Sequence, residues 1–232
     1  MLKLGLSLSL SSLRGSGAWK PTDEGTIVGW WKHATGITDS GAPNYDVSKW
    51  DDQSDNNNQL VQATASEQPT NGTGANDGVI TFNPSNTENM DMTSQISLSG
   101  DFTIGASLNV AAGGCVLLGD NTANGEFFRF FSTSKIRIRI DNTTAVDIDK
   151  DSGTFLGQAY MVLTRVSNVI TLYWNGVAQA DTETLSGTAD IDNLGVRKTD
   201  TNPYDGTISE LMIFSAANDT LTANVNDRLA SI

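Results

Sequence analysis

Three aspartates alternate in one short segment, at Asp147, Asp149 and Asp151. Alternation along a strand places side chains on one face, and two carboxyls about 5–5.5 Å apart can cleave a glycosidic bond with retention. The segment has no glutamate and lies between turn signals, where a run of aspartates is usually a solvated strand end. With the single histidine His33 and no Gly-x-Ser-x-Gly motif, a serine-type triad has no support. We therefore expect no enzyme, and we keep glycan hydrolysis as a third hypothesis.

The turn after Trp50 has the spacing of a calcium loop, with oxygen-bearing side chains at Asp52, Ser54, Asn56 and Asn58. Its sixth position is asparagine instead of glycine and its twelfth is alanine instead of glutamate, so it is not an EF-hand. Two interpretations stay open: an asparagine-rich turn, and a weak Ca²⁺ site formed by Asp52, Asn56 and Asn58. One histidine and one cysteine cannot complete a zinc cage, and we expect no other cofactor.

Basic residues gather in one part of this acidic chain. Lys135, Arg137 and Arg139 alternate with isoleucines, and together with Arg129 they place four of the 14 Lys and Arg residues within eleven positions. One interpretation is a surface strand whose charges pair with nearby aspartates, each pair contributing little. The other is a contact patch for an acidic neighbour, such as a second copy of the same chain.

Glycan binding needs aromatic platforms beside aspartate or asparagine at loop tips. Tyr45 with Asp46, and Tyr204 with Asp205, combine these residue types in segments that the sequence places in loops. Trp50 and Trp174 lie at apolar-periodic positions instead, which favours a place in the core. Tyr45, Asp46, Tyr204 and Asp205 are therefore the candidate glycan-binding residues.

The charge balance restricts the partners. The 232 residues carry 27 acidic and 14 basic side chains, a formal net charge of −13. That charge opposes binding to phosphate backbones and anionic lipids, so we expect no nucleic-acid and no membrane partner. No apolar run reaches the roughly 18 residues of a membrane span.

Short apolar-periodic segments separated by turn signals must position these residues. About a dozen strands are expected, with Asn175-Gly176 as the strongest hairpin signal, which indicates an antiparallel β-sandwich. Only the tail is typical of a helix, in which Thr220 can cap a turn or two carrying Leu221, Val225, Leu229 and Ile232 on one face.

A leucine-rich arm comes first in the chain. Leucines alternate with other residues at Leu2, Leu4, Leu6, Leu8 and Leu10, which predicts a strand with one apolar face. An exposed apolar edge strand invites association, so this arm is a candidate anchor for assembly. We expect residues 1–18 to form the arm and its linker, and residues 19–232 to form a single sandwich domain.

Three segments resemble laminin-G/concanavalin-A-like jelly rolls. The first is the turn WDDQSDNNNQLVQATASEQPT, with aspartate and asparagine where glycines usually stand. The second is the hairpin VITLYWNGVAQA, and the third is the closing strand that carries the pattern Gly206-x-Ile208-x-Glu210. The first segment supplies Trp50, Asp52, Ser54, Asn56, Asn58, Gln68 and Pro69. The resemblance implies a jelly-roll β-sandwich, in a superfamily where calcium is common.

A second resemblance is more specific. MLKLGLSLS, WDDQS, MTSQISLSG, LGDNTANGEFF and GVRKTDTNPYDGTI are similar to a family of virion structural proteins from tailed phages of marine cyanobacteria. This resemblance implies localisation in the virion, with the major capsid protein or a tail protein as partner, and a homo-oligomer. Our expectation is a non-enzymatic capsid-surface decoration or fibre component. The alternative is a glycan-binding module on tail or capsid for adhesion to host or surface.

Overall fold

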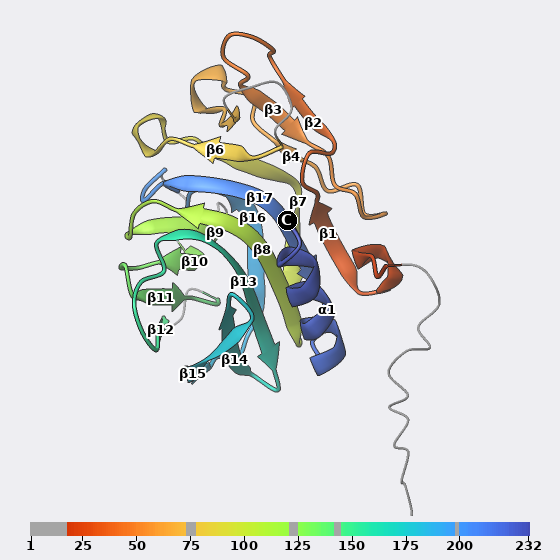
Figure 1. Cartoon of the computed structure of the whole chain (residues 1–232), viewed down its shortest axis with the longest axis vertical. Coiled ribbons are helices and arrows are strands. Elements are labelled where there is room, and N and C mark those ends of the chain that lie inside the picture. The colour runs from red at the N-terminus through yellow and green to blue at the C-terminus, as the bar shows by residue number, and fades with distance from the viewer. Residues whose placement is uncertain (1–17, 73–77, 121–124, 142–144, 198–199) are drawn as a thin grey trace, which may run out of the picture.

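Two antiparallel β-sheets pack face to face in the computed structural model of this chain (Figure 1). The structure describes residues 18–72, 78–120, 125–141, 145–197 and 200–232. The alternating pattern of the sequence produces this arrangement, because strands with one apolar face must bury that face against another sheet. The expected all-β sandwich is confirmed. The leucine arm, Leu2 to Leu10, lies outside the described residues.

The first sheet has eight strands in the order β15-β14-β13-β8-β17-β6-β5, with β1 paired to β17. Its strands are β1 (Ile27–Trp31), β5 (Thr70–Asn71), β6 (Ile80–Phe82), β8 (Phe102–Val110), β13 (Gly157–Val166), β14 (Val169–Trp174), β15 (Val177–Thr184) and β17 (Gly206–Phe214). The Asn175-Gly176 turn joins β14 to β15, as the sequence predicts.

The second sheet has nine strands in the order β12-β11-β10-β9-β16-β7-β4-β3-β2. Its strands are β2 (Ile37–Asp39), β3 (Val47–Trp50), β4 (Leu60–Val61), β7 (Met90–Leu98), β9 (Cys115–Asp120), β10 (Gly125–Phe130), β11 (Lys135–Ile138), β12 (Val146–Asp149) and β16 (Ala189–Leu194). Short 3-10 turns occupy Pro21–Asp23, Ala65–Glu67 and Pro84–Asn86.

An aromatic core fills the space between the sheets. Trp174 meets Phe155 with ring centroids 5.0 Å apart, and Phe130 lies 6.1 Å from the same indole. Trp31 and Trp50 are also fully buried. Edge-to-face aromatic contacts of this kind hold two sheets at a fixed spacing and orientation. Cys115 is buried as expected of a small apolar residue, and burial raises the pKa of its thiol to about 11.

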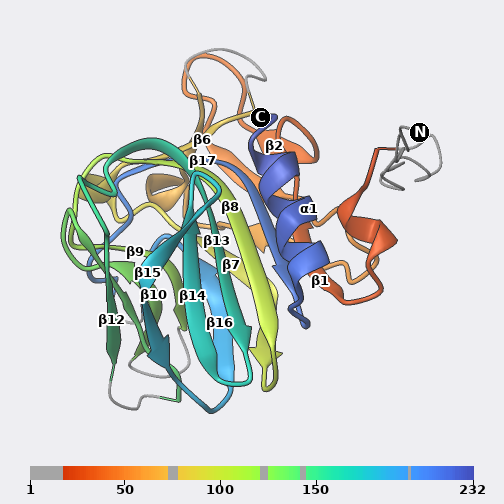
Figure 2. The ribbon, with the colours of Figure 1, turned by 60° about the horizontal axis from the view of Figure 1, so that its bottom comes forward.

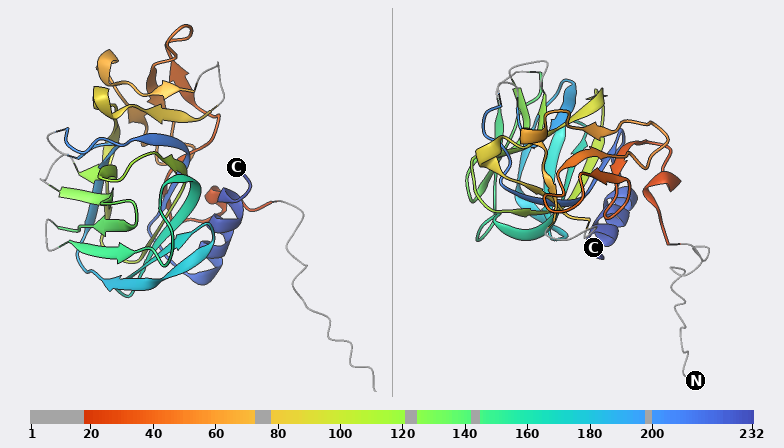
Figure 3. Two further views of the ribbon diagram at one scale, coloured as in Figure 1. Left: turned by 60° about the vertical axis from the view of Figure 1, so that its left-hand side comes forward. Right: turned by 90° about the horizontal axis from the view of Figure 1, so that it is seen from above.

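Helix α1 (Asp219–Leu229) lies on the outer face of the eight-stranded sheet, across β8 and β13 (Figure 1, Figure 2 and Figure 3). Its buried face carries Leu221, Val225 and Leu229, as the sequence predicts. The helix begins two residues earlier than expected. Its N-cap is Asn218 instead of Thr220, and the Asn218 side chain accepts the Leu221 N–H at 2.9 Å.

A buried ion pair fixes the last turn of α1 to the sheet. Glu210 on β17 is fully buried, and both of its carboxylate oxygens accept hydrogen bonds from the guanidinium of Arg228. The indole of Trp30 donates to the same carboxylate at 2.8 Å. Because each polar group of this cluster has a partner, the helix end is held in one position against the sheet.

In the described part of the chain, no helix combines the length and the apolar character needed to cross a membrane.

Candidate functional site

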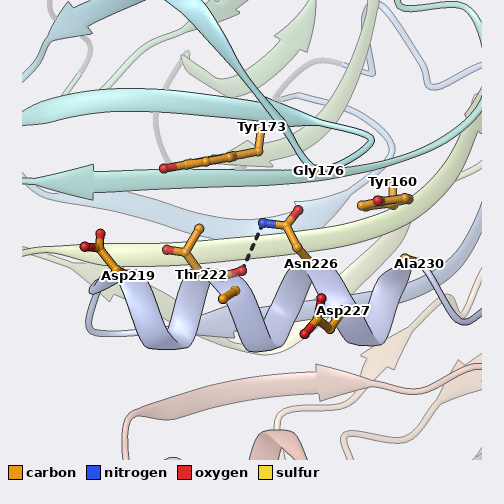
Figure 4. Close-up of a pocket in the computed structure, with 9 residues that line it drawn as sticks. Tyr160, Tyr173, Gly176, Asp219, Thr222, Asn226, Asp227 and Ala230 are labelled. Atoms are coloured by element: carbon orange, nitrogen blue, oxygen red, sulfur yellow. Dashed lines mark hydrogen bonds between the residues drawn. The ribbon is translucent and has the colours of Figure 1, made fainter. Parts of the chain in front are cut away.

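A cavity of about 430 Å³ opens between helix α1 and the hairpin of β13 and β14 (Figure 4). This volume lies in the range of small-molecule sites, about 300–1,000 Å³. The helix forms one wall and two tyrosines of the sheet form the other. The nine described residues that line it are Tyr160, Tyr173, Gly176, Asp219, Thr222, Ala223, Asn226, Asp227 and Ala230.

The two tyrosines reach the cavity because strand alternation turns them away from the core. On β14, Tyr173 lies between Leu172 and Trp174, both of which point into the sandwich. Val162 of β13 is the register partner of Tyr173, and Tyr160 lies two residues before Val162. Tyr160 and Tyr173 are therefore diagonal neighbours on the outer face, a spacing at which large side chains act together. Both are partly buried, with their rings lying beside the helix (Figure 4).

The β14–β15 turn holds Tyr160 in place. Asn175 accepts the backbone N–H of Tyr160 at 3.0 Å through its side-chain oxygen. Gly176 has φ of +77°, and a Cβ at this position would lie 3.0 Å from the Tyr160 hydroxyl oxygen. The Asn-Gly pair that the sequence marks as a hairpin thus also makes room for the ring of a site residue.

The helix contributes a polar group that has no partner. The Nδ2 of Asn226 donates to the backbone carbonyl of Thr222 at 2.9 Å, which sets the orientation of the amide. Its Oδ1 is buried and accepts no hydrogen bond from any described residue. An unpaired buried acceptor costs about 1–3 kcal/mol, and such groups often mark a position that a ligand or water satisfies.

The charge of the cavity is negative. Asp219, in the first turn of α1, points toward the sheet on the side of Tyr173, whereas Asp227 points away from both tyrosines (Figure 4). The nine described lining residues include no lysine and no arginine. The cavity therefore offers aromatic faces, hydroxyls and hydrogen-bond acceptors, which are groups that bind a polyhydroxylated or donor-rich ligand.

The loop tyrosines predicted for glycan binding have different environments. Tyr204 is fully buried, donates to the Asn109 carbonyl at 3.0 Å, and packs edge-on against Phe82 with centroids 5.7 Å apart. Its ring has no exposed face on which a sugar could stack, so this expectation is wrong. Tyr204 is a core residue, and the neighbouring Asp205 is partly buried.

Tyr45 is partly buried and remains a candidate. It has φ of 55°, and its backbone carbonyl accepts the Asn71 N–H at 2.9 Å. Asp46, also partly buried, forms an isolated β-bridge with Thr70. The described contacts therefore fix the backbone of this loop and leave the part played by the Tyr45 ring as a prediction.

The proposed calcium ligands are engaged within the protein. The carboxylate of Asp52 is buried and accepts four hydrogen bonds, two on each oxygen: from the backbone N–H groups of Trp30, Ser54 and Asn58, and from the Ser54 hydroxyl, at 2.8–3.0 Å. Asn56 donates to the Ile27 carbonyl at 2.9 Å.

Asn58, the remaining proposed ligand, exchanges hydrogen bonds with the backbone of Ser94, donating at 2.7 Å and accepting at 2.9 Å. Donors occupy the side-chain oxygens of Asp52 and Asn58, so these two residues do not fit a cation. Among the described residues, no cluster of three or more His, Cys, Asp or Glu side chains could hold a metal ion. The asparagine-rich turn is the interpretation that the contacts support.

The basic stripe is ion-paired on the outer face of the nine-stranded sheet. Arg137 makes a bidentate contact with Asp147 at 2.7 and 3.0 Å, and Lys135 lies 2.9 Å from Asp149. Arg129 donates to Asn202, on a different part of the chain, at 2.7 Å. The predicted pairing of Lys135 and Arg137 with neighbouring aspartates is thus present.

Arg139, the fourth member of the stripe, is partly buried and directly follows the end of β11. The contact patch of Arg129, Lys135, Arg137 and Arg139 stays a prediction.

The three alternating aspartates serve structure. The hydrogen bond from Arg137 is the main reason that the pKa of Asp147 is lowered. Asp151 accepts the Ala180 N–H at 2.9 Å, which joins the end of β12 to β15 of the other sheet. These contacts assign the carboxylates to ion pairs and to the seam between the sheets.

Comparison with known protein families decides the superfamily. Residues 73–222 match the family described as the concanavalin A-like lectin/glucanases superfamily. The chain belongs to this superfamily. The matched range contains Tyr160 and Tyr173 and ends within helix α1. No curated protein matches the sequence.

Solved structures agree on the fold. The chain is similar to Trypanosoma rangeli sialidase in complex with sialic acid, at TM-score 0.57 and 12% identity over 90% of this chain and 33% of that one. Trypanosoma rangeli sialidase gives 0.53 and 11% over 90% and 33%. A mutant of the same sialidase displaying trans-sialidase activity gives 0.53 and 13% over 89% and 33%. The chain spans about a third of these proteins, and at such identities the likeness shows the fold alone.

Sequence reasoning missed the helix–hairpin cavity. The signal was present, because Tyr173 stands between two core residues and so must face outward. What the sequence does not show is that α1 crosses β13 at this point and brings Asn226 opposite the tyrosines, more than fifty positions away along the chain.

Proposed function

We propose that this chain is a non-enzymatic component of a phage virion whose sandwich domain binds glycans in the cavity between α1 and the β13–β14 hairpin. The observation that carries the glycan-binding part is the cavity itself: two outward-facing tyrosines opposite a buried, unpartnered amide oxygen. The virion part rests on the sequence resemblance, and the capsid-surface decoration or fibre role is its most specific form.

The cavity suits a sugar for two physical reasons. The C–H faces of a pyranose are apolar and stack on aromatic rings, while its hydroxyls need acceptors at fixed positions. Tyr160 and Tyr173 supply the rings, and the Oδ1 of Asn226 supplies an acceptor whose cost of burial a sugar hydroxyl would remove.

A binding role is favoured over hydrolysis. In most glycosidase families, cleavage of a glycosidic bond uses two carboxyls that flank the bond. Of the two aspartates that line the cavity, Asp227 points away from the tyrosines, which leaves Asp219 alone on the ligand side (Figure 4). Binding without chemistry suits adhesion of a particle to a cell surface, which needs contact and not turnover.

The proposed virion role also gives functions to the surfaces outside the cavity. The outer surface is acidic, and its basic stripe is held by ion pairs, properties that oppose adhesion to nucleic acid. In this proposal the leucine arm, residues 2–10, pairs with the major capsid protein, a tail protein or a second copy of the chain. The Arg129–Arg139 stripe is the second contact surface.

Isothermal titration against a panel of cell-surface oligosaccharides tests glycan binding. We expect Tyr160→Ala and Tyr173→Ala each to weaken binding about tenfold, which corresponds to about 1.4 kcal/mol. Tyr45→Ala is the comparison variant, because it removes a partly buried tyrosine from the loop between β2 and β3, outside the lining of the cavity. Weakened binding in Tyr45→Ala with full binding in the two cavity variants would move the site to the Tyr45–Asp46 loop. No binding to any glycan of a broad panel would refute the glycan-binding part.

A further inference from the structure

We infer that the ligand of this cavity carries a positively charged amino group, so that its class is an amino-sugar glycan and not an acidic one. This inference rests on the proposed glycan-binding function and specifies the charge of the ligand. The cavity offers an aspartate carboxylate, a buried amide oxygen and two aromatic rings, and its described lining has no lysine or arginine.

The described lining of the site carries negative charge and no positive charge. Asp219 presents an exposed carboxylate on the sheet side of the helix (Figure 4). An ammonium has three donors and no acceptor, so a ligand amine can pair with this carboxylate. The Oδ1 of Asn226, a buried acceptor without a partner, lies about two helical turns further along and accepts from a hydroxyl of the same ligand.

The tyrosines favour a cation as well. The face of an aromatic ring is electron-rich, and an ammonium within about 6 Å of its centroid is attracted to it. Tyr160 and Tyr173 lie side by side along the sheet wall, so a ligand seated between them and α1 has a ring on one side and Asp219 on the other.

The two basic residues on α1, β13 and β14 are engaged elsewhere. Arg228 of α1 forms two hydrogen bonds with the buried Glu210 and stacks over Trp30 at 5.0 Å, on a different face of the helix from Asn226. Arg165 of β13 is buried and donates to the carbonyls of Leu98 and Gly100. Asp227, between this cavity and the adjoining one near Trp19, adds a second negative charge at the rim. The net charge of −13 repels anionic ligands over a longer range.

A matched ligand pair tests the inference. Tetramers of glucosamine and of N-acetylglucosamine have the same backbone and differ in the charge of the nitrogen, and a sialylated oligosaccharide supplies the acidic case. By isothermal titration in mildly acidic, low-salt buffer, we expect the glucosamine tetramer to bind about tenfold more tightly than the acetylated one. We expect no measurable binding of the sialylated ligand.

Variants separate the charge effect from the shape of the site. Asp219→Asn should remove most of the preference for the amine while leaving binding of the acetylated tetramer within about twofold. Asp55→Asn removes the same charge from an exposed turn that does not line the cavity and should change neither value.

Four outcomes count against the inference. Equal or tighter binding of the acetylated tetramer, lost in Tyr173→Ala, would refute the charge preference and leave the glycan-binding proposal standing, and tight binding of the sialylated ligand would do the same. A preference that survives Asp219→Asn would refute Asp219 as its source. No binding of any of the three ligands, together with none on a broad panel, would refute both.

Discussion

Gly105 of β8 decides how closely helix α1 approaches the sheet, and its replacement by alanine tests the packing that forms the cavity. Its register partners are Met212 and Val162, so that it forms a hollow in the outer face of the sheet. A Cβ here would lie 2.4 Å from Cγ1 of Val225 and 3.1 Å from Cδ1 of Leu229. Both are buried residues of the helix, so α1 must shift outward.

The magnitude follows from two opposing terms. Overpacking of a tight core costs about 1–3 kcal/mol. The lower chain entropy of alanine in the unfolded state returns about 0.4–1 kcal/mol, since the backbone of Gly105 is not in the left-handed region. We expect a net loss of about 1–2 kcal/mol, which for a chain of this size lowers Tm by roughly 2–8 °C. Glycan binding should weaken as well, because the outward shift moves Asn226 away from the tyrosines.

Thermal unfolding followed by circular dichroism, together with titration of the bound glycan, measures both effects. Gly100→Ala is the matched control, because a Cβ at that exposed position meets no atom within 4 Å. Val225→Ala should make room for the new methyl, so the double variant Gly105→Ala/Val225→Ala should be more stable than the sum of the single effects by about 1 kcal/mol. Wild-type Tm and binding in Gly105→Ala, or strict additivity in the double variant, would refute this account of the helix position.

Three further outcomes are expected. Glu210→Gln should lower the free energy of unfolding in urea by about 3 kcal/mol with an unchanged m-value, because it leaves the guanidinium of Arg228 unpaired beside Trp30; a loss under 1 kcal/mol would contradict the role of this ion pair. The pKa of Asp147 is lowered in the folded protein by Arg137, so its contribution to stability is present above the pKa of the unfolded state and is lost as pH falls through the folded pKa. Asp147→Asn should therefore flatten the acid limb of the stability–pH curve slightly, by less than about 1 kcal/mol for this solvent-exposed pair, and an unchanged curve would contradict the assignment. Deletion of residues 1–12 should reduce incorporation of the protein into phage particles, measured against the major capsid protein, and unchanged incorporation would refute the anchoring role.

The strand faces, the main hairpin turn and the buried face of the helix could be predicted from local sequence patterns. Alternation along β8 and β14 marks their buried faces, and Asn175-Gly176 marks the turn that follows β14. The spacing of Leu221, Val225 and Leu229 predicts the face of α1 that meets the sheet. These features depend on neighbours in the sequence, and the structure confirms them.

The site depends on contacts between distant segments, which local patterns do not contain. Tyr204 follows a turn signal and reads as exposed, but the segment folds inward and its ring packs against Phe82. Tyr160 reads as part of a buried strand, but its ring lies on the outer face where α1 leaves a space. The loop at Asp52 suits either an asparagine-rich turn or a weak Ca²⁺ site, and the structure favours the turn because the Asp52 carboxylate accepts hydrogen bonds from Trp30 and Ser54. In each case the residue type suits several roles, and a tertiary contact decides which role the residue has.

The location of the glycan site is the central claim, and nuclear magnetic resonance tests it most directly. The side-chain amide of Asn226 gives a distinct pair of signals in a ¹H–¹⁵N spectrum of the labelled protein. On titration with glucosamine tetramer, the account expects saturable shifts of these signals together with the backbone amides around Tyr160, Tyr173 and Gly176. Saturable shifts confined to the Tyr45–Asp46 loop, or to any surface away from α1, would contradict it.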